Sequence, residues 1–293
     1  MNNHLEHLVK ALEDGTLDFY EEQDEAPIAC VQCGECCHNR EDILLSPFDL
    51  YNLVQATGKN VETILEKYTD MYVGENSHVP IVRLRYRQEP DGTTTCYFLG
   101  RKDGKAYCRV QSHKPAVCRI YPFGKLGSFA KDKTDEEADE KIRYFLQDIN
   151  GCGGCKGINQ ARVCGEKHSL IEWVGGCETK RLSDKYSVIF NRFMTKYTRL
   201  LDKRSPEKRW DSITVRAFYE GSARLIYTAY DYTVTPDEFL EVLEKNLNAV
   251  YTMAETLVND PQYFKKEAKK RIKEILSSGN CTHSDKEKNN QSA

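Results

Sequence analysis

Four cysteines stand within eight residues, at Cys30, Cys33, Cys36 and Cys37, and this run constrains the fold more than any other feature of the chain. Of the twelve cysteines in the sequence, eleven fall between residues 30 and 177. A CxxC turn points two sulfurs to the same side with little strain, so closely spaced thiols can converge on one soft cation or cluster. The run therefore predicts a metal-binding segment.

A disulfide framework is the alternative use of these thiols, and it requires an oxidising compartment. The first fifteen residues do not read as an export signal, because Leu5, Leu8, Val9 and Leu12 are spaced as one side of an amphipathic helix and no unbroken apolar core is present. We therefore expect reduced thiols and a cytoplasmic protein.

Composition indicates a globular chain and excludes two classes of partner. Of its 293 residues 40% are hydrophobic, yet no stretch approaches the apolar length of a transmembrane segment. The net charge of -3 gives no global positive field, so we expect no nucleic acid partner. A protein partner would bind the helical half beyond Asp202, which is rich in tyrosine, although most of these rings are expected in the core. They are Tyr219, Tyr227, Tyr230 and Tyr232.

Cysteine usage also divides the chain, since residues 178–280 contain none. We expect an α+β fold in which residues 1–177 form a cysteine-cluster metal-binding domain, built as a small cysteine-rich antiparallel sheet with metal-binding loops. A mainly α-helical region should follow over residues 178–277. The small, polar residues 278–293 read as a disordered tail, in which Cys281 is an incidental thiol.

Capping signals mark the expected helices. The pair Ser46-Pro47 predicts a helix that stops near Gly58, and a second helix should start after Asn60. Further helices are predicted over 169–174, 183–202, 206–230, 236–258 and 261–277, the last two opening on a cap followed by proline. Shorter alternating segments between residues 78 and 110 predict the sheet, and another strand is expected at 141–147.

The Asp103-Gly104 turn is expected to set the register of two cysteine-bearing strands. If Leu99 faces Lys105 across the loop, then Cys96 faces Cys108. Opposed residues in an antiparallel pair have Cβ atoms about 4.5 to 5.5 Å apart, close enough for both thiolates to reach one metal. The same spacing would suit a cross-strand disulfide.

Two further segments add thiols to the expected centre. Cys118 follows in a turn or short helix that should return to the same place, and Cys152 and Cys155 form another CxxC. The glycines around this CxxC would let backbone amides approach sulfur or a cluster closely. The candidate metal ligands are Cys30, Cys33, Cys36, Cys37, Cys96, Cys108, Cys118, Cys152 and Cys155.

These motifs resemble the YkgJ-type cysteine cluster family over roughly residues 27–201. The likeness rests on CxxCGxCC, on C-x-F-L with a cysteine about a dozen residues later, and on the segment Lys114-Pro115-x-x-Cys118-Arg119-x-Tyr121-Pro122-Phe123. The family is described as a zinc- or iron-chelating domain, and the chain is distantly like flagellin lysine methylase, whose family cysteines are associated with an iron-sulfur cluster. The resemblance implies that the candidate ligands bind metal, with Cys152 or Cys155 in the last place. The extra cysteine in CGGC, together with Cys164 and Cys177, departs from the family pattern.

The choice of metal follows from spacing. Cys30, Cys33 and Cys36 repeat the C-x2-C-x2-C start of bacterial ferredoxin loops, which favours an iron-sulfur cluster, 4Fe-4S in type. The fourth ferredoxin position is Arg40, which cannot ligate, so a remote cysteine must complete the set. Cys37 should diverge from Cys36 and serve a second centre or stay a free thiol. The alternative cofactor is zinc, which would make the protein a structural interaction module.

No reaction is predicted from local motifs. His38, His113 and His168 lie near cysteines but are interpreted as hydrogen-bond partners or caps rather than ligands. Lys114 and Arg119 would place positive charge beside the thiolates. A phosphate loop, the C-x3-C-x2-C spacing of radical adenosylmethionine enzymes and a serine triad are absent, so catalytic residues are unknown. A cluster-dependent protein lysine methylase stays an alternative on the resemblance alone.

Overall fold

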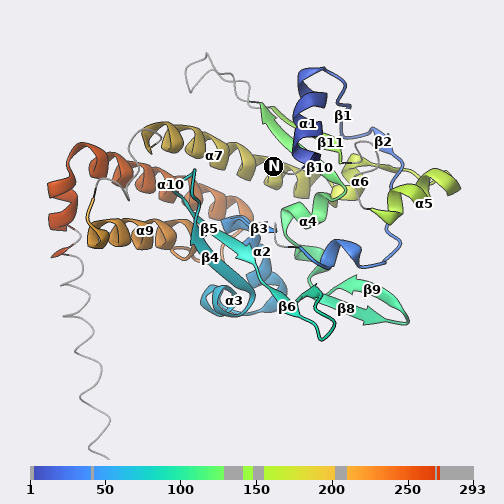
Figure 1. Cartoon of the computed structure of the whole chain (residues 1–293), viewed down its shortest axis with the longest axis horizontal. Helices are drawn as coiled ribbons and strands as arrows, with labels where there is room; N and C mark the ends of the chain where they lie inside the picture. The colour runs from blue at the N-terminus through green and yellow to red at the C-terminus, as the bar shows by residue number, and fades with distance from the viewer. Residues whose placement is uncertain are drawn as a thin grey trace, which may run out of the picture.

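The computed structural model describes residues 3–40, 43–128, 141–147, 155–201, 210–267 and 269–270. Small antiparallel sheets occupy the N-terminal half and helices make up the C-terminal half, so the predicted α+β class is confirmed. Helices α7, α9 and α10 lie together on the left of Figure 1, whereas α4, α5 and the β8–β9 hairpin lie on the right.

The α-helices are α1 Asn3–Glu13, α2 Pro47–Thr57, α3 Val61–Tyr68, α4 Ala116–Ile120, α5 Lys156–Cys164, α6 Leu170–Val174, α7 Cys177–Leu201, α9 Ser212–Tyr227 and α10 Pro236–Asn259, and the short 3-10 helices are η1 Glu35–Cys37 and η2 Gln111–His113. The strands are β1 Phe19–Tyr20, β2 Glu25–Ala26, β3 Leu44–Leu45, β4 Thr69–Val73, β5 Pro80–Leu84, β6 Tyr86–Gln88, β7 Thr94–Cys96, β8 Leu99–Lys102, β9 Lys105–Cys108, β10 Phe123–Ser128, β11 Lys141–Leu146 and β12 His168–Ser169.

Capping boxes open three of these helices, as the sequence predicts for α2 and α10. At α2 the backbone N–H of Asp49 donates to the Ser46 hydroxyl at 3.0 Å, and the Ser46 N–H donates back to the Asp49 carboxylate at 2.8 Å. The same exchange joins Thr235 to Glu238 at α10 and Ser169 to Glu172 at α6. Reciprocal bonds of this kind satisfy backbone donors that the first helical turn leaves free.

One predicted helix start differs from the structure, and another lies outside the described residues. Helix α7 begins at Cys177, six residues before the predicted start at 183. The predicted start at 206 lies outside the described residues, and α9 runs over Ser212–Tyr227. Residues 261–267 are helical as predicted, whereas 271–293, with the expected tail, and the acidic segment 132–140 lie outside the described part of the chain.

The strands form separate small sheets, paired as β1–β11–β10, β2–β12, β3–β5–β4, β6–β7 and β8–β9. The predicted register is wrong: Leu99 pairs with Cys108 and Lys102 with Lys105, while Cys96 pairs with Tyr86 on another strand. The cause lies in the loop between β8 and β9, where Asp103 and Gly104 both have positive φ, of 52° and 76°. In such a two-residue turn the residues on either side of the turn, here Lys102 and Lys105, pair with each other.

One large core joins the two halves. It combines buried residues of α2, α3 and β5 with those of α7, α9 and α10. The buried hydroxyl of Tyr227 donates to the Pro80 carbonyl at 3.0 Å, and that of Tyr197 donates to the His78 carbonyl at 2.8 Å. Tyr227 lies in this core, and Tyr219, Tyr230 and Tyr232 pack against it, as expected. Because the core crosses residue 177, the division into domains at that position stays a prediction.

A second core lies under the β1–β11–β10 sheet. It includes Ile28, Phe123, Tyr144, Ile158 and Leu170. The segment just before the cysteine run is therefore anchored through Ile28, whose side chain is fully buried. Among the residues described, no helix has the length and apolarity needed to cross a membrane.

Candidate metal centre

The cysteine run turns sharply at Gly34, whose φ of 81° starts the short helix η1. The run is fixed to strand β9, because the Ala106 N–H donates to the Gln32 carbonyl at 2.9 Å and a Cβ at Gly34 would lie 3.0 Å from the Ala106 Cβ. In η1 the Sγ atoms of Cys36 and Cys37 lie 3.9 Å apart. The expected divergence of these adjacent side chains is therefore wrong.

That sulfur pair is electrostatically coupled. The pKa of Cys36 is lowered to about 6, chiefly because its thiolate accepts a hydrogen bond from the Cys37 thiol, and the Lys114 ammonium and Arg40 guanidinium add to the effect. The pKa of Cys37 is raised for the reciprocal reason, and burial raises it further. One thiolate and one thiol thus share the pair.

Three more thiols approach this pair from separate elements. Cys96 ends β7, Cys108 ends β9 and Cys118 lies in α4. Burial raises the pKa of each, and the charges of other members of the group raise it further: Cys108 acts on Cys96, Cys36 acts on Cys108, and Cys96 and Cys36 act on Cys118. The Phe98 N–H donates to the Cys96 sulfur at 3.4 Å, a bond that favours a thiolate there.

A fifth segment, which carries Cys155, lies beside the cysteine run although it is more than a hundred residues away in the sequence. It is the N-cap of α5, and a Cβ on Gly157 would lie 1.8 Å from the Ala29 carbonyl oxygen, so the start of α5 rests directly on the backbone before Cys30. Burial raises the pKa of Cys155, and the charges of Cys36 and Cys33 raise it further. Lys156 also forms an exposed ion pair with Glu35 at 2.8 Å.

The structure does not gather all of the candidate ligands. Cys30 is exposed, although its neighbour Ala29 lies against α5. Cys164 and Cys177 are exposed at the end of α5 and the start of α7. Cys152 lies outside the described residues. The described thiols that act electrostatically on one another are Cys33, Cys36, Cys37, Cys96, Cys108, Cys118 and Cys155.

Residues 29–145 match a family model described as "Putative zinc- or iron-chelating domain". These residues are therefore similar to the CxxCxxCC domain, a name used below for the matched segment 29–145. The match supports metal binding and covers η1, β7, β9 and α4, whereas Cys155 lies beyond it. The finer likeness to flagellin lysine methylase is not shown by this match. No curated protein and no solved structure matches the chain.

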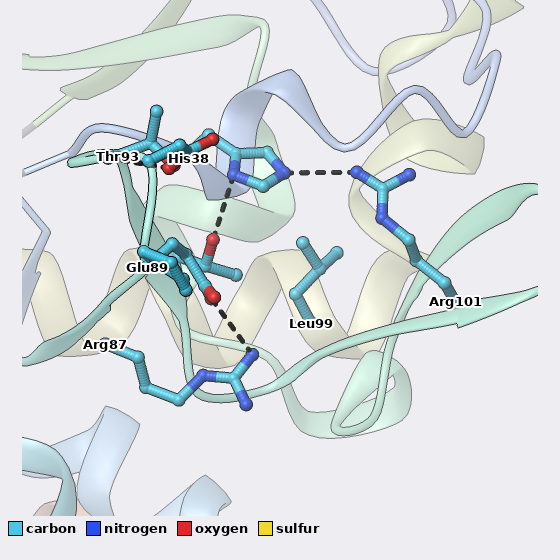
Figure 2. A pocket seen from close by; sticks show the side chains of 9 residues that line it. His38, Arg87, Glu89, Thr93, Leu99 and Arg101 are labelled. Carbon is cyan, nitrogen blue, oxygen red and sulfur yellow. Dashed lines mark hydrogen bonds and ion pairs between the residues drawn. The ribbon is translucent and has the colours of Figure 1, made fainter.

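His38, the histidine that follows the cysteine run, is already engaged by other side chains. Figure 2 shows the His38 ring between strands, where Nδ1 lies 3.1 Å from the Thr95 hydroxyl and Nε2 lies 3.3 Å from an Arg101 nitrogen. Arginine can only donate, so Nε2 accepts and Nδ1 donates to Thr95. These residues border a surface cavity of about 420 Å³. Both nitrogens have partners, which agrees with the interpretation of His38 as a positioning residue rather than a ligand.

Three residues of the centre escape sequence reasoning. Tyr86 lies opposite Cys96 in the β6–β7 pair, and burial followed by the nearby thiols raises its pKa. Burial and the charge of Cys155 raise the pKa of Tyr121 to about 12. Asp49 is 3% exposed, and its carboxylate accepts the Ala116 N–H at 2.7 Å, which ties α2 to the helix that carries Cys118. Tyr121 stands in the segment that carries the family resemblance and Asp49 in a capping box, but neither signal indicated that the residue lies beside the thiols or contacts α4.

The donor set fits a thiophilic metal in its chemistry. The groups that converge are thiols, which soft zinc, copper(I) and iron-sulfur centres prefer. The 3.9 Å between the sulfurs of Cys36 and Cys37 also matches the spacing of about 3.8 Å that two ligands take on a tetrahedral ion with Zn–S bonds of about 2.3 Å. Over the described ranges, however, no three His, Cys, Asp or Glu side chains are already arranged around one point for an ion. At the described residues, a single ion would therefore need further thiols to move inward.

Proposed function

We propose that the CxxCxxCC domain holds an iron-sulfur cluster of the 4Fe-4S type through convergent cysteine thiolates. The observation that carries the proposal is the approach of Cys96, Cys108 and Cys118, each from a different element, to the Cys36–Cys37 pair. Four thiolates suffice for a 4Fe-4S cluster. The domain supplies more than four.

The spread of the thiols favours a cluster over a single ion. A cubane carries each thiolate on a different iron, so its ligands stand farther apart than four ligands on one ion. No described trio is close enough for one ion, while the mutual effects on pKa place the thiols within electrostatic reach of one another. The nearby cations Lys114 and Arg40 offset part of the negative charge that several thiolates bring.

Zinc is the second candidate, and the close contact of Cys36 with Cys37 supports it. Two sulfurs 3.9 Å apart have the spacing of neighbouring ligands on one tetrahedral ion. In that case the domain is a structural module, whose site fastens the cysteine run to β7, β9 and α4. It would then act through binding rather than redox chemistry.

Anaerobic purification followed by iron, zinc and acid-labile sulfide analysis tests the proposal. We expect iron and sulfide in equal amounts, with visible absorption that bleaches on reduction. Cys118→Ser should lose most of this iron, whereas the matched control Cys164→Ser, at an exposed position away from the thiol group, should keep it. Zinc at one or two equivalents without sulfide would establish the second candidate. Absence of any stoichiometric metal would refute both.

A further inference from the structure

A second hollow lies beside the thiol group, between α2, the segment that leads into α4, and α7. Its volume is about 350 Å³, at the small end of the range for ligand pockets. Phe48, Tyr51, Ile120 and Val174 form part of its apolar lining, and the rings of Phe48 and Tyr51 stack in parallel with centroids 5.7 Å apart. These walls suit a small molecule with a flat or apolar body.

The polar part of the lining is basic. Lys114, Arg119 and Lys180 border the cavity, and no Asp or Glu is among its described lining residues. Lys180 is neutralised by Asp184 at 2.8 Å and Glu22 at 3.4 Å. The positive charge at the cavity therefore comes from Lys114 and Arg119, although Lys114 also acts on the thiols of Cys36, Cys108 and Cys118.

Neither of those two cations has a carboxylate ion pair within the described residues. Arg119 donates to the Ser112 carbonyl at 2.7 Å and is half-buried, so burial lowers its pKa without neutralising it. Lys114 forms no hydrogen bond or ion pair with any residue that the structure describes. The carboxylate of Asp49, whose charge acts on Arg119, already accepts hydrogen bonds from Ser46 and Ala116. Partly buried cations that lack partners favour an anion.

We propose that this cavity binds a small organic anion, with its apolar body against Phe48 and Tyr51 and its carboxylate or phosphate group on Lys114 and Arg119. Asn52 borders the same space and has no side-chain partner in the described structure, so its amide can complete the polar contacts. Arg119 follows Cys118 directly, so the ligand would lie beside the metal-binding helix. The proposal does not depend on which metal the domain holds.

The test is ligand-observed saturation-transfer NMR on the full chain, purified anaerobically with its metal. The probes are benzoate and phenyl phosphate, with benzamide as the uncharged match. We expect at least one anion to bind saturably and benzamide not to bind. Lys114→Met should weaken binding about tenfold or more, because it removes a charged hydrogen-bond donor. Lys102→Met, at an exposed position on the β8–β9 hairpin, should leave binding unchanged.

Asn52→Phe provides a test that keeps both cations, because the added ring fills the cavity and should abolish binding. Circular dichroism and metal content show that each variant is folded and loaded. Tighter binding of benzoate or of phenyl phosphate identifies the head group, and either result supports the site. The proposal is overturned if neither anion binds, if benzamide binds as well as benzoate, or if the folded Lys114→Met and Asn52→Phe variants bind as the parent does.

Discussion

Asp49 offers the sharpest test of how the helical scaffold positions a cysteine. Its carboxylate, 3% exposed, accepts the Ser46 N–H at 2.8 Å, the Ser46 hydroxyl at 2.7 Å and the Ala116 N–H at 2.7 Å. Ala116 is the first residue of α4, and Cys118 follows two residues later. Replacing Asp49 with Ala should therefore destabilise the fold and lower metal occupancy together.

The expected loss of stability can be worked from these contacts. Losing the reciprocal cap costs about 1 kcal/mol. Leaving the Ala116 N–H without an acceptor costs about 1 to 3 kcal/mol, since a buried donor that loses its partner bears its full desolvation cost. The variant no longer bears the desolvation cost of a buried carboxylate, and this offsets part of the loss. We therefore expect a net loss of about 2 to 3 kcal/mol for Asp49→Ala. Asp49→Asn keeps an acceptor oxygen and should lose about half as much.

Anaerobic urea unfolding of the metal-loaded protein measures these differences, with metal content determined on the same samples. Glu66→Ala, on the exposed side of α3, is the control and should change stability by less than about 0.5 kcal/mol. Equal urea midpoints for the Asp49→Ala and Glu66→Ala variants would refute the reasoning. So would a destabilised Asp49→Ala variant with full metal content, because the link from α2 to Cys118 would then be irrelevant to the site.

The pH dependence of stability in wild type and in Asp49→Asn tests whether burial raises or lowers the pKa of Asp49. Burial raises the pKa of Asp49 in the folded state, so the folded protein binds this proton more tightly than the unfolded chain. The contribution of Asp49 to stability is therefore greatest below the unfolded pKa of about 3.9 and declines as pH rises toward the folded pKa. Wild type should lose stability relative to Asp49→Asn over this window. If wild type instead gained stability relative to Asp49→Asn as pH rises, the raised pKa of Asp49 would be contradicted.

Three further predictions concern the rest of the molecule. Tyr227→Phe leaves the Pro80 carbonyl without its donor and should lower the free energy of unfolding by about 1 to 2 kcal/mol in the same urea assay; no change would show that water replaces the hydroxyl. Burial lowers the pKa of Lys125 to about 8, so the folded protein loses this proton at a lower pH than the unfolded chain. Wild type should therefore gain stability relative to Lys125→Met as pH rises from about 8 to about 10. If the difference in unfolding free energy does not change across that range, the charge of Lys125 is not buried. Cys33→Ala should speed proteolysis of the cysteine run while α10 stays protected, as peptide mapping would show, because metal orders that run; equal resistance of variant and parent would mean that this cysteine is not a structural ligand.

Local signals predicted those parts of the fold that local chemistry determines. Ser46-Pro47 and Thr235-Pro236 placed the starts of α2 and α10 correctly, because a capping box satisfies backbone donors within four residues. The same reasoning missed α5, whose N-cap Cys155 makes no side-chain cap bond and whose start instead rests on Ala29. A helix start that depends on a distant backbone segment leaves no mark in its own sequence.

The candidate site shows the same limit. The sequence identified thiols as the donors, but the register of Cys96 and Cys108 was wrong because the tight turn at Asp103-Gly104 pairs its own neighbours first. The contact of Cys36 with Cys37 was missed because it depends on the turn at Gly34 and not on alternation along an extended chain. Spacing predicted which residue types meet, whereas loop conformation decided how they meet.

The packing of the start of α5, which Cys155 caps, on the backbone before Cys30 also has a consequence for synthesis of the chain. Cys155 follows Cys37 by 118 residues, so at a translation rate of about 5 to 20 residues per second it emerges roughly 6 to 24 seconds after the cysteine run. During that interval the four closely spaced thiols of the nascent chain lack the start of α5, which later packs beside them. A cell that makes this protein must therefore keep those thiols reduced, and free of competing metals, for the time that a ribosome needs to reach the next CxxC.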